Sequence, residues 1–225
     1  METVLISLLP YIIGSAVVPL QIIIGLLLLK SPNQGLFKAI AYVVGMTIAR
    51  LFQGLVFGFV LSGSSALTAD SGKNPIVSTL LLVLGILLLI TAYKKWRREE
   101  DPDDLPPKGF TMIGSLTPLR AFGFGLGLPL LAAKLWVFTL SALATIAAAQ
   151  LGWLSSTIVY LLFVLLAESL LLLPILLRIV IPERSKHLLA KLSAWLTQNS
   201  RPVTIMVSLI FGLFFLQSGI TGLLG

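Results

Sequence analysis

Hydrophobic residues fall into six long runs, and the short segments between them hold most of the charged residues. The runs cover residues 4–29, 36–61, 76–93, 120–148, 154–181 and 202–224. A helix rises about 1.5 Å per residue and the hydrocarbon core of a bilayer is about 30 Å thick, so each run is long enough to cross it. The pattern predicts an all-α, polytopic membrane protein with six transmembrane helices.

The composition excludes a soluble globular protein. Of the 225 residues, 57% are hydrophobic and 11% are charged, and the mean hydropathy is +1.02. Soluble domains carry about 25% charged residues. We therefore expect an integral membrane protein, placed in the bacterial inner (plasma) membrane.

The basic residues are distributed unevenly between the two sides of the predicted bundle. Thirteen of the 16 Lys and Arg residues lie near the loops after the first, third and fifth runs, whereas Lys73 stands alone in the other loops. By the positive-inside rule, loops 30–36, 94–118 and 182–201 are cytoplasmic and both termini are outside. This distribution explains the net charge of +7 without nucleic acid as a partner.

Two cytoplasmic segments have their own character. Residues 94–118 are basic and then acidic and Pro-rich, which is typical of a flexible linker. Residues 183–199 place Leu188, Leu192 and Trp195 at helical spacing beside basic residues. This segment is either an amphipathic helix in the membrane interface or a connector that packs on the bundle.

Three runs precede the linker and three follow it, so the halves 1–93 and 119–225 enter the membrane from opposite sides. Gly14–Leu29 and Gly125–Leu140 share a Gly-containing stretch, a proline (Pro19 or Pro129) and then a longer apolar run. This weak similarity indicates a 3+3 inverted repeat, which is common in secondary transporters. The two prolines are predicted to break their helices.

A resemblance to a known family is carried by the segments Leu26–Ala49, Ser115–Gln150 and Pro182–Val207, together with Pro174. On these residues the chain resembles the peptidoglycolipid-addressing protein (GAP, or Sap) family of the lysine-exporter (LysE) superfamily. The resemblance implies six spans and a link to the export of glycolipids or other envelope components.

One motif departs from that family. Members usually have an Asn-Pro-Lys signature early in the fourth span, whereas this chain has Ala132-Ala133-Lys134. The lysine is kept and the Asn-Pro pair is lost, so the substrate can differ from that of better-matched members.

Three charged residues lie near the middle of the runs: Arg50, Lys134 and Glu168, with Gln21 and Gln53 at similar depth. A central Arg, Lys or Asp costs about 2.5 to 3.5 kcal/mol on insertion scales. These side chains therefore face either one another, as a structural ion-pair network, or a polar cavity at the midplane. Two positive charges against one negative charge would favour an anion in such a cavity.

The second alternative assigns a role to each residue. Arg50 and Lys134 would bind the anion, and Gln21 and Gln53 would add neutral hydrogen bonds. Glu168 is the candidate ion-coupling carboxylate, because burial and a basic neighbour shift its protonation in opposite senses. Pro19 and Pro129 would shape broken helices around the site.

The favoured function is a secondary exporter of an anionic or amphipathic small molecule or lipid, working by alternating access with ion coupling. No Walker-type loop is present, which argues against direct ATP hydrolysis. A non-transporting membrane scaffold is the alternative. A metal-cation exporter is disfavoured because Glu168 is the one carboxylate at depth.

Catalysis and cofactors are not expected. The chain has no cysteine and one histidine, and it lacks a clustered Ser/His/Asp set, so we expect neither an enzyme nor a bound cofactor or metal. The expected partners are membrane lipids and the transported anion, and a homodimer is left open.

Overall fold

The computed structural model describes residues 2–62, 75–97 and 112–224, apart from the side chains of 59–62, 75–77, 133, 134 and 186. Within these ranges the chain is helical and has no strand. The helices are α1 (Glu2–Ala16), α2 (Pro19–Leu29), α3 (Gly35–Ser62), α4 (Pro75–Arg97), α6 (Pro118–Leu131), α7 (Ala133–Ala148), α8 (Trp153–Ala167), α9 (Ser169–Val180) and α10 (Pro182–Leu224). Of the predicted linker 94–118, residues 98–111 lie outside the described residues, and residues 94–97 are the end of α4 rather than linker.

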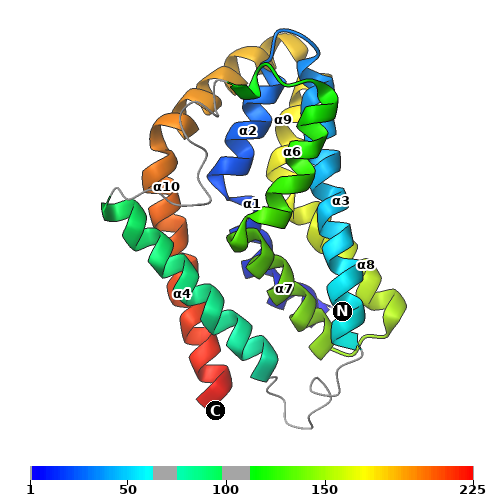
Figure 1. Cartoon of the computed structure of the whole chain (residues 1–225), viewed down its shortest axis with the longest axis vertical. Coiled ribbons are helices and arrows are strands. Elements are labelled where there is room, and N and C mark those ends of the chain that lie inside the picture. The colour runs from blue at the N-terminus through cyan, green and yellow to red at the C-terminus, as the bar shows by residue number, and fades with distance from the viewer. Residues whose placement is uncertain (1, 63–74, 98–111, 225) are drawn as a thin grey trace.

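Three spans are continuous and three are broken. Helices α3, α4 and α10 are each long and apolar enough to cross a membrane. The pairs α1–α2, α6–α7 and α8–α9 meet that test only together, and they bend by 55°, 67° and 62° at their breaks. Counting each bent pair as one span gives six (Figure 1), which confirms the prediction of a polytopic all-α membrane protein.

The breaks lie only partly where the prolines predicted them. Pro19 is the first residue of α2, after an extended Val18, as expected for a residue without an amide hydrogen. In the fourth span the helix continues through Pro129 to Leu131, and the break is at Ala132. The fifth span breaks at Glu168, where the sequence predicted no break.

The expected interfacial helix is not a separate element. Residues 183–199 form the first part of α10, which runs without interruption through Pro202. Leu189 is buried against the bundle, whereas Leu188 and Trp195 are more than half exposed. One face of this segment therefore packs on the protein, as a connector does. A neighbouring apolar face remains exposed, as an interfacial helix requires.

The closest packing between spans occurs at glycines. Helix α3 lies beside α6, and α4 lies beside α10 (Figure 1). Between α3 and α6, a Cβ atom on Gly125 would collide with the backbone carbonyl of Tyr42, and one on Gly45 would collide with that of Phe122. Small residues allow such backbone contact between membrane helices, so these glycines fix the position of α6 on α3.

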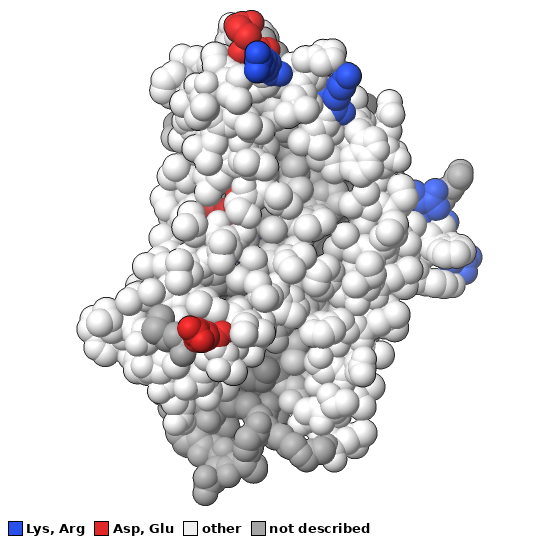
Figure 2. Space-filling model, turned by 180° about the vertical axis from the view of Figure 1, so that it is seen from behind, with Lys and Arg blue, Asp and Glu red and all other residues white. Residues whose placement is uncertain are grey.

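The outer surface has the distribution expected of a membrane protein. Many large hydrophobic side chains are exposed, including Phe37, Leu55 and Leu131, and Figure 2 shows a broad face that is largely free of charge, with basic side chains at its upper end and one side. Arg201 donates from Nε to the carbonyl of Lys95 at 2.7 Å and from Nη2 to that of Trp96 at 2.7 Å. It thereby ties α10 to the end of α4.

Candidate functional site

Arg50 lies at the centre of a buried polar cluster. It projects from α3, its side chain is 0% exposed, and its Nε lies 3.3 Å from Oε1 of Glu168. Its Nη2 donates to the hydroxyl of Ser15, near the end of α1, at 2.9 Å. Arg50 Nη1 has no hydrogen-bond partner among the described residues, so the guanidinium retains donor capacity that a buried site normally uses.

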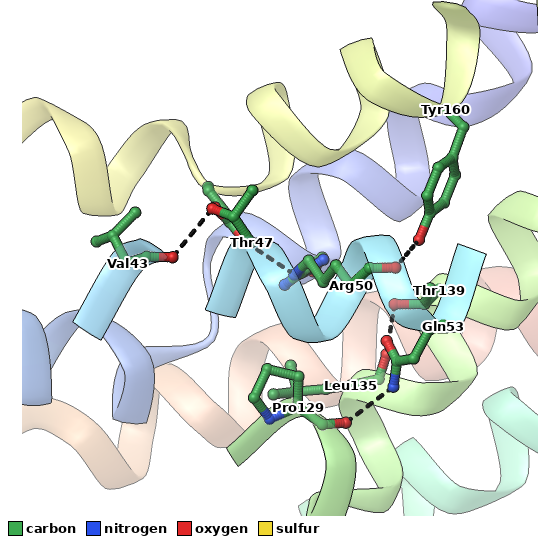
Figure 3. A network of polar contacts seen from close by, with 10 residues as sticks. Val43, Thr47, Arg50, Gln53, Pro129, Leu135, Thr139 and Tyr160 are labelled. Carbon is green, nitrogen blue, oxygen red and sulfur yellow. Dashed lines mark hydrogen bonds and ion pairs between the residues drawn. The ribbon is translucent and has the colours of Figure 1, made fainter. Parts of the chain in front are cut away.

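Glu168 occupies the break between α8 and α9 and is 2% exposed. Its Oε2 lies 2.6 Å from the hydroxyl of Thr47, which in turn lies 2.9 Å from the carbonyl of Val43 (Figure 3). A hydroxyl has one hydrogen. Thr47 therefore donates either to an ionised Glu168 or to Val43, and in the second case it can accept a hydrogen from a protonated Glu168.

Tyr160 holds the other side of this part of α3. Its hydroxyl donates to the main-chain carbonyl of Arg50 at 2.6 Å (Figure 3). Gly54 leaves the space for the ring, because a Cβ atom there would overlap it. Helix α8 is thus fixed to α3 on the side of the break that precedes Glu168.

Gln53 and Trp136 stabilise the break in the fourth span. Gln53 is 1% exposed, and its Nε2 donates to the carbonyl of Pro129 at 3.0 Å (Figure 3). Trp136 Nε1 donates to the carbonyl of Leu130 at 2.7 Å. These carbonyls belong to the last turn of α6, which lacks intrahelical donors, so the two side chains replace the bonds that the break removes.

Gln21 lies in a different place. It belongs to the first turn of α2, is 1% exposed, and its Nε2 has no hydrogen-bond partner within the described part of the chain. It lines a cavity of about 70 Å³ that is bordered by the first, third, fourth and sixth spans. The other lining residues are Gly14, Val18, Pro19, Leu20, Leu88, Leu128, Ala132, Leu135, Phe138, Thr204, Val207 and Ser208.

Two helix starts border this cavity. Val18, the N-cap of α2, and Ala132, the N-cap of α7, both line it, and neither makes a side-chain capping bond. Lys134 is the second residue of α7. Its side chain lies outside the described residues, so its predicted contact with Glu168 or an anion remains a prediction.

The structure divides the predicted site residues between two neighbouring places. Arg50 and Glu168 are in contact, and Gln53 lies one turn from Arg50 on α3. Gln21 and Pro19 line the cavity, whose lining includes neither Arg50 nor Glu168. Pro129 is not among the lining residues: its carbonyl accepts from Gln53, and its neighbour Leu128 lines the cavity.

Sequence reasoning missed the neutral partners Ser15, Thr47, Tyr160 and Trp136. Thr47 could have been found, because it precedes Arg50 by three residues and such residues share a helix face. Ser15 and Tyr160 come from distant segments and carry no such signal, and Trp136, six residues from Leu130 in the same span, contacts it only because the helix breaks between them. Across the described residues, no group of three metal-ligating side chains occurs.

Comparisons with known proteins identify the family. Neither a curated protein nor a solved structure matches the chain significantly. The family model of Sap, sulfolipid-1-addressing protein, matches residues 8–221 and so covers both halves of the chain and both candidate places. The chain therefore belongs to the Sap, sulfolipid-1-addressing protein, family.

Proposed function

We propose that this chain is a secondary transporter that exports an anionic or amphipathic lipid or small molecule by alternating access. Membership of a family named for addressing a sulfolipid supports a role in lipid export. Three spans broken inside the membrane support a transport mechanism, because discontinuous helices usually border the substrate and ion sites of secondary transporters. The proposed role is transport rather than catalysis.

The observation that carries the proposal is the position of the Arg50–Glu168 ion pair at the break between α8 and α9. A buried pair that only fixes packing is equally well placed within continuous helices. At a break, the same contact connects α3 to the point about which α8 and α9 can turn. Opening and closing of the pair would then accompany movement of the fifth span.

Glu168 is the proposed ion-coupling group. The single hydrogen of Thr47 fits both an ionised and a protonated Glu168. A proton that binds Glu168 would remove its charge and weaken the pair with Arg50. Proton binding would thus favour the rearranged state, and substrate export would be coupled to proton movement.

The remaining parts of the proposal concern topology. The breaks of α1–α2 and α6–α7 would be equivalent positions in an inverted repeat, as in the lysine-exporter superfamily. Both termini would be outside the plasma membrane, and membrane lipids would surround the bundle. Lys134, two residues after the break at Ala132, would contact the exported anion.

A lipidomic comparison of cells with and without the chain tests the proposal. We expect at least one anionic amphiphile to decrease outside the plasma membrane and accumulate inside when the chain is deleted. Wild-type protein should restore its distribution, and Glu168→Gln should not. Arg184→Met is a control for expression, since Arg184 is an exposed residue of α10.

The coupling is tested in the same cells by collapsing the proton gradient, which should stop export by the wild-type protein. Unchanged lipids on both sides of the membrane in cells lacking the chain would reject the transport proposal. A stoichiometric protein partner in mild detergent would then favour the scaffold alternative.

A further inference from the structure

We propose that the cavity beside Gln21 binds the singly charged oxyanion of an amphipathic ligand, such as a sulfate ester, a carboxylate or a phosphodiester. This inference rests on the proposed transport function and gives it a substrate site. The site differs from the Arg50–Glu168 pair, whose charges already neutralise each other within the protein.

The electrostatics of the cavity favour one negative charge. A helix start has roughly half a positive elementary charge, owing to amide hydrogens without intrahelical acceptors. The starts of α2 and α7 both border the cavity, and neither has a side-chain cap. The last turns of α1 and α6, which contain Gly14 and Leu128, line the same cavity and carry the opposite partial charge. The starts of α2 and α7 therefore favour a negative charge on their own side of the cavity, in a setting where a full charge would be costly.

Gln21 gives independent evidence for a ligand. Its side chain is 1% exposed, it lines the cavity, and its Nε2 finds no acceptor among the residues described. A buried donor without a partner is unusual, because it loses its hydrogen bonds to water and gains none in exchange. The Nε2 atom itself is almost inaccessible, so a turn of the side chain would bring it to an anion in the cavity, whose oxygen would accept this bond.

The walls indicate that the ligand is amphipathic. Leu88, Leu128, Phe138 and Val207 make most of the lining apolar. The volume of about 70 Å³ is several times the roughly 10 to 15 Å³ that one water needs on the same measure. It can hold a small head group but not a whole lipid, so an attached alkyl chain would extend past the apolar side chains Leu88, Leu128 and Phe138.

Equilibrium binding of radiolabelled hexadecyl sulfate to the full chain in nanodiscs tests the site, with empty nanodiscs as the partition control. We expect saturable binding by the wild-type protein. Gln21→Glu should weaken it at least tenfold, because the new carboxylate repels the anion. Gln21→Leu should weaken it about threefold to tenfold. Gln217→Glu and Gln217→Leu are matched controls at an exposed position of α10 and should bind as the wild type does.

Competition identifies the ligand class. Hexadecanol, which has the chain without the charge, should not displace the probe. Displacement by methyl sulfate would show that a free small anion occupies the site, whereas a lack of displacement would show that the anion must be part of a lipid. Absence of saturable binding, equal displacement by hexadecanol, or wild-type affinity in Gln21→Glu would overturn the proposal.

Val18→Ser separates loss of the site from loss of the fold. Val18 has the extended conformation of an N-cap, with φ −64° and ψ 109°, and serine is a favoured residue there. The hydroxyl should bond to the free amides of α2, so affinity should fall while thermal stability is maintained or rises. A joint fall in affinity and stability would count against the helix start as part of the site.

The outcomes also separate this site from the transport proposal. Wild-type export by Gln21→Glu would overturn the site alone. Saturable, Gln21-dependent binding in a protein whose deletion leaves cellular lipids unchanged would overturn transport alone.

Discussion

The cluster around Arg50 and the cavity beside Gln21 both border the first broken span. The two regions differ in how their buried polar groups are paired. In the cluster, two opposite charges contact each other, and Ser15 and Thr47 add hydrogen bonds. In the cavity wall, the Nε2 of the neutral amide of Gln21 has no hydrogen-bond partner among the described residues. Arg50 Nη1 also lacks one, so the two regions differ in the neighbouring cavity and not in the unused donor alone. If the proposed ligand site is correct, an unused donor next to a cavity marks it better than formal charge does.

The largest effect that tests this comparison is expected at the ion pair. Arg50→Met leaves Glu168 as an unpaired buried charge, and the loss of one partner of such a pair costs about 3 to 5 kcal/mol. The double variant Arg50→Met/Glu168→Leu leaves no charge, so we expect it to recover most of this loss. The free energies of unfolding in detergent would be compared as a double-mutant cycle.

Export by the same variants distinguishes an ion pair that only stabilises the fold from one that takes part in transport. If the pair only stabilises the fold, the double variant should export as the wild type does. We expect it to fold and not to export. A double variant whose loss of stability equals the sum of the two single losses would show that Arg50 and Glu168 do not interact, and the proposed coupling would lose its basis.

Much of the fold could be predicted from the sequence, because long apolar runs have few stable alternatives in a bilayer. The six spans and the burial of Arg50 and Glu168 follow from that constraint. The ends of the helices do not. We predicted residues 183–199 and the sixth span as two segments, because a proline such as Pro202 is common at the start of a helix. In the structure, α10 continues through this proline.

The positions of the breaks depend on tertiary partners that a single span does not reveal. Pro129 pointed to the right turn of the fourth span, but the break at Ala132 is fixed by Gln53 from α3 and by Trp136. Glu168 was identified as a buried charge, whereas its location at a break was not, since no proline or glycine adjoins it. The separation of Gln21 from Arg50 is likewise a matter of packing between helices.

A smaller effect is expected where α6 packs on α3, which sets the distance between the cluster and the cavity wall. In Gly125→Ala the new methyl group would overlap the carbonyl of Tyr42, and overpacking of this kind costs about 1 to 3 kcal/mol. Gly123→Ala is the matched control, two residues away in the same helix with no atom within 4 Å of the new Cβ. It should be neutral or stabilising by up to about 1 kcal/mol, from helix propensity. Equal thermal unfolding of the two variants would contradict the close contact.

The smallest and most direct test compares two glutamines that are equally buried, at 1% exposure each. Gln53→Leu removes the donor to the carbonyl of Pro129 and leaves that carbonyl unpaired, so we expect a loss of about 1 to 2 kcal/mol. Gln21→Leu removes a donor that already lacks a partner. In ligand-free protein it should therefore be neutral or stabilising by up to about 1 kcal/mol. Thermal unfolding without ligand measures both. A destabilisation of the same size in Gln21→Leu as in Gln53→Leu would mean that Gln21 has a partner within the protein, and the two regions would then not differ in the way argued above.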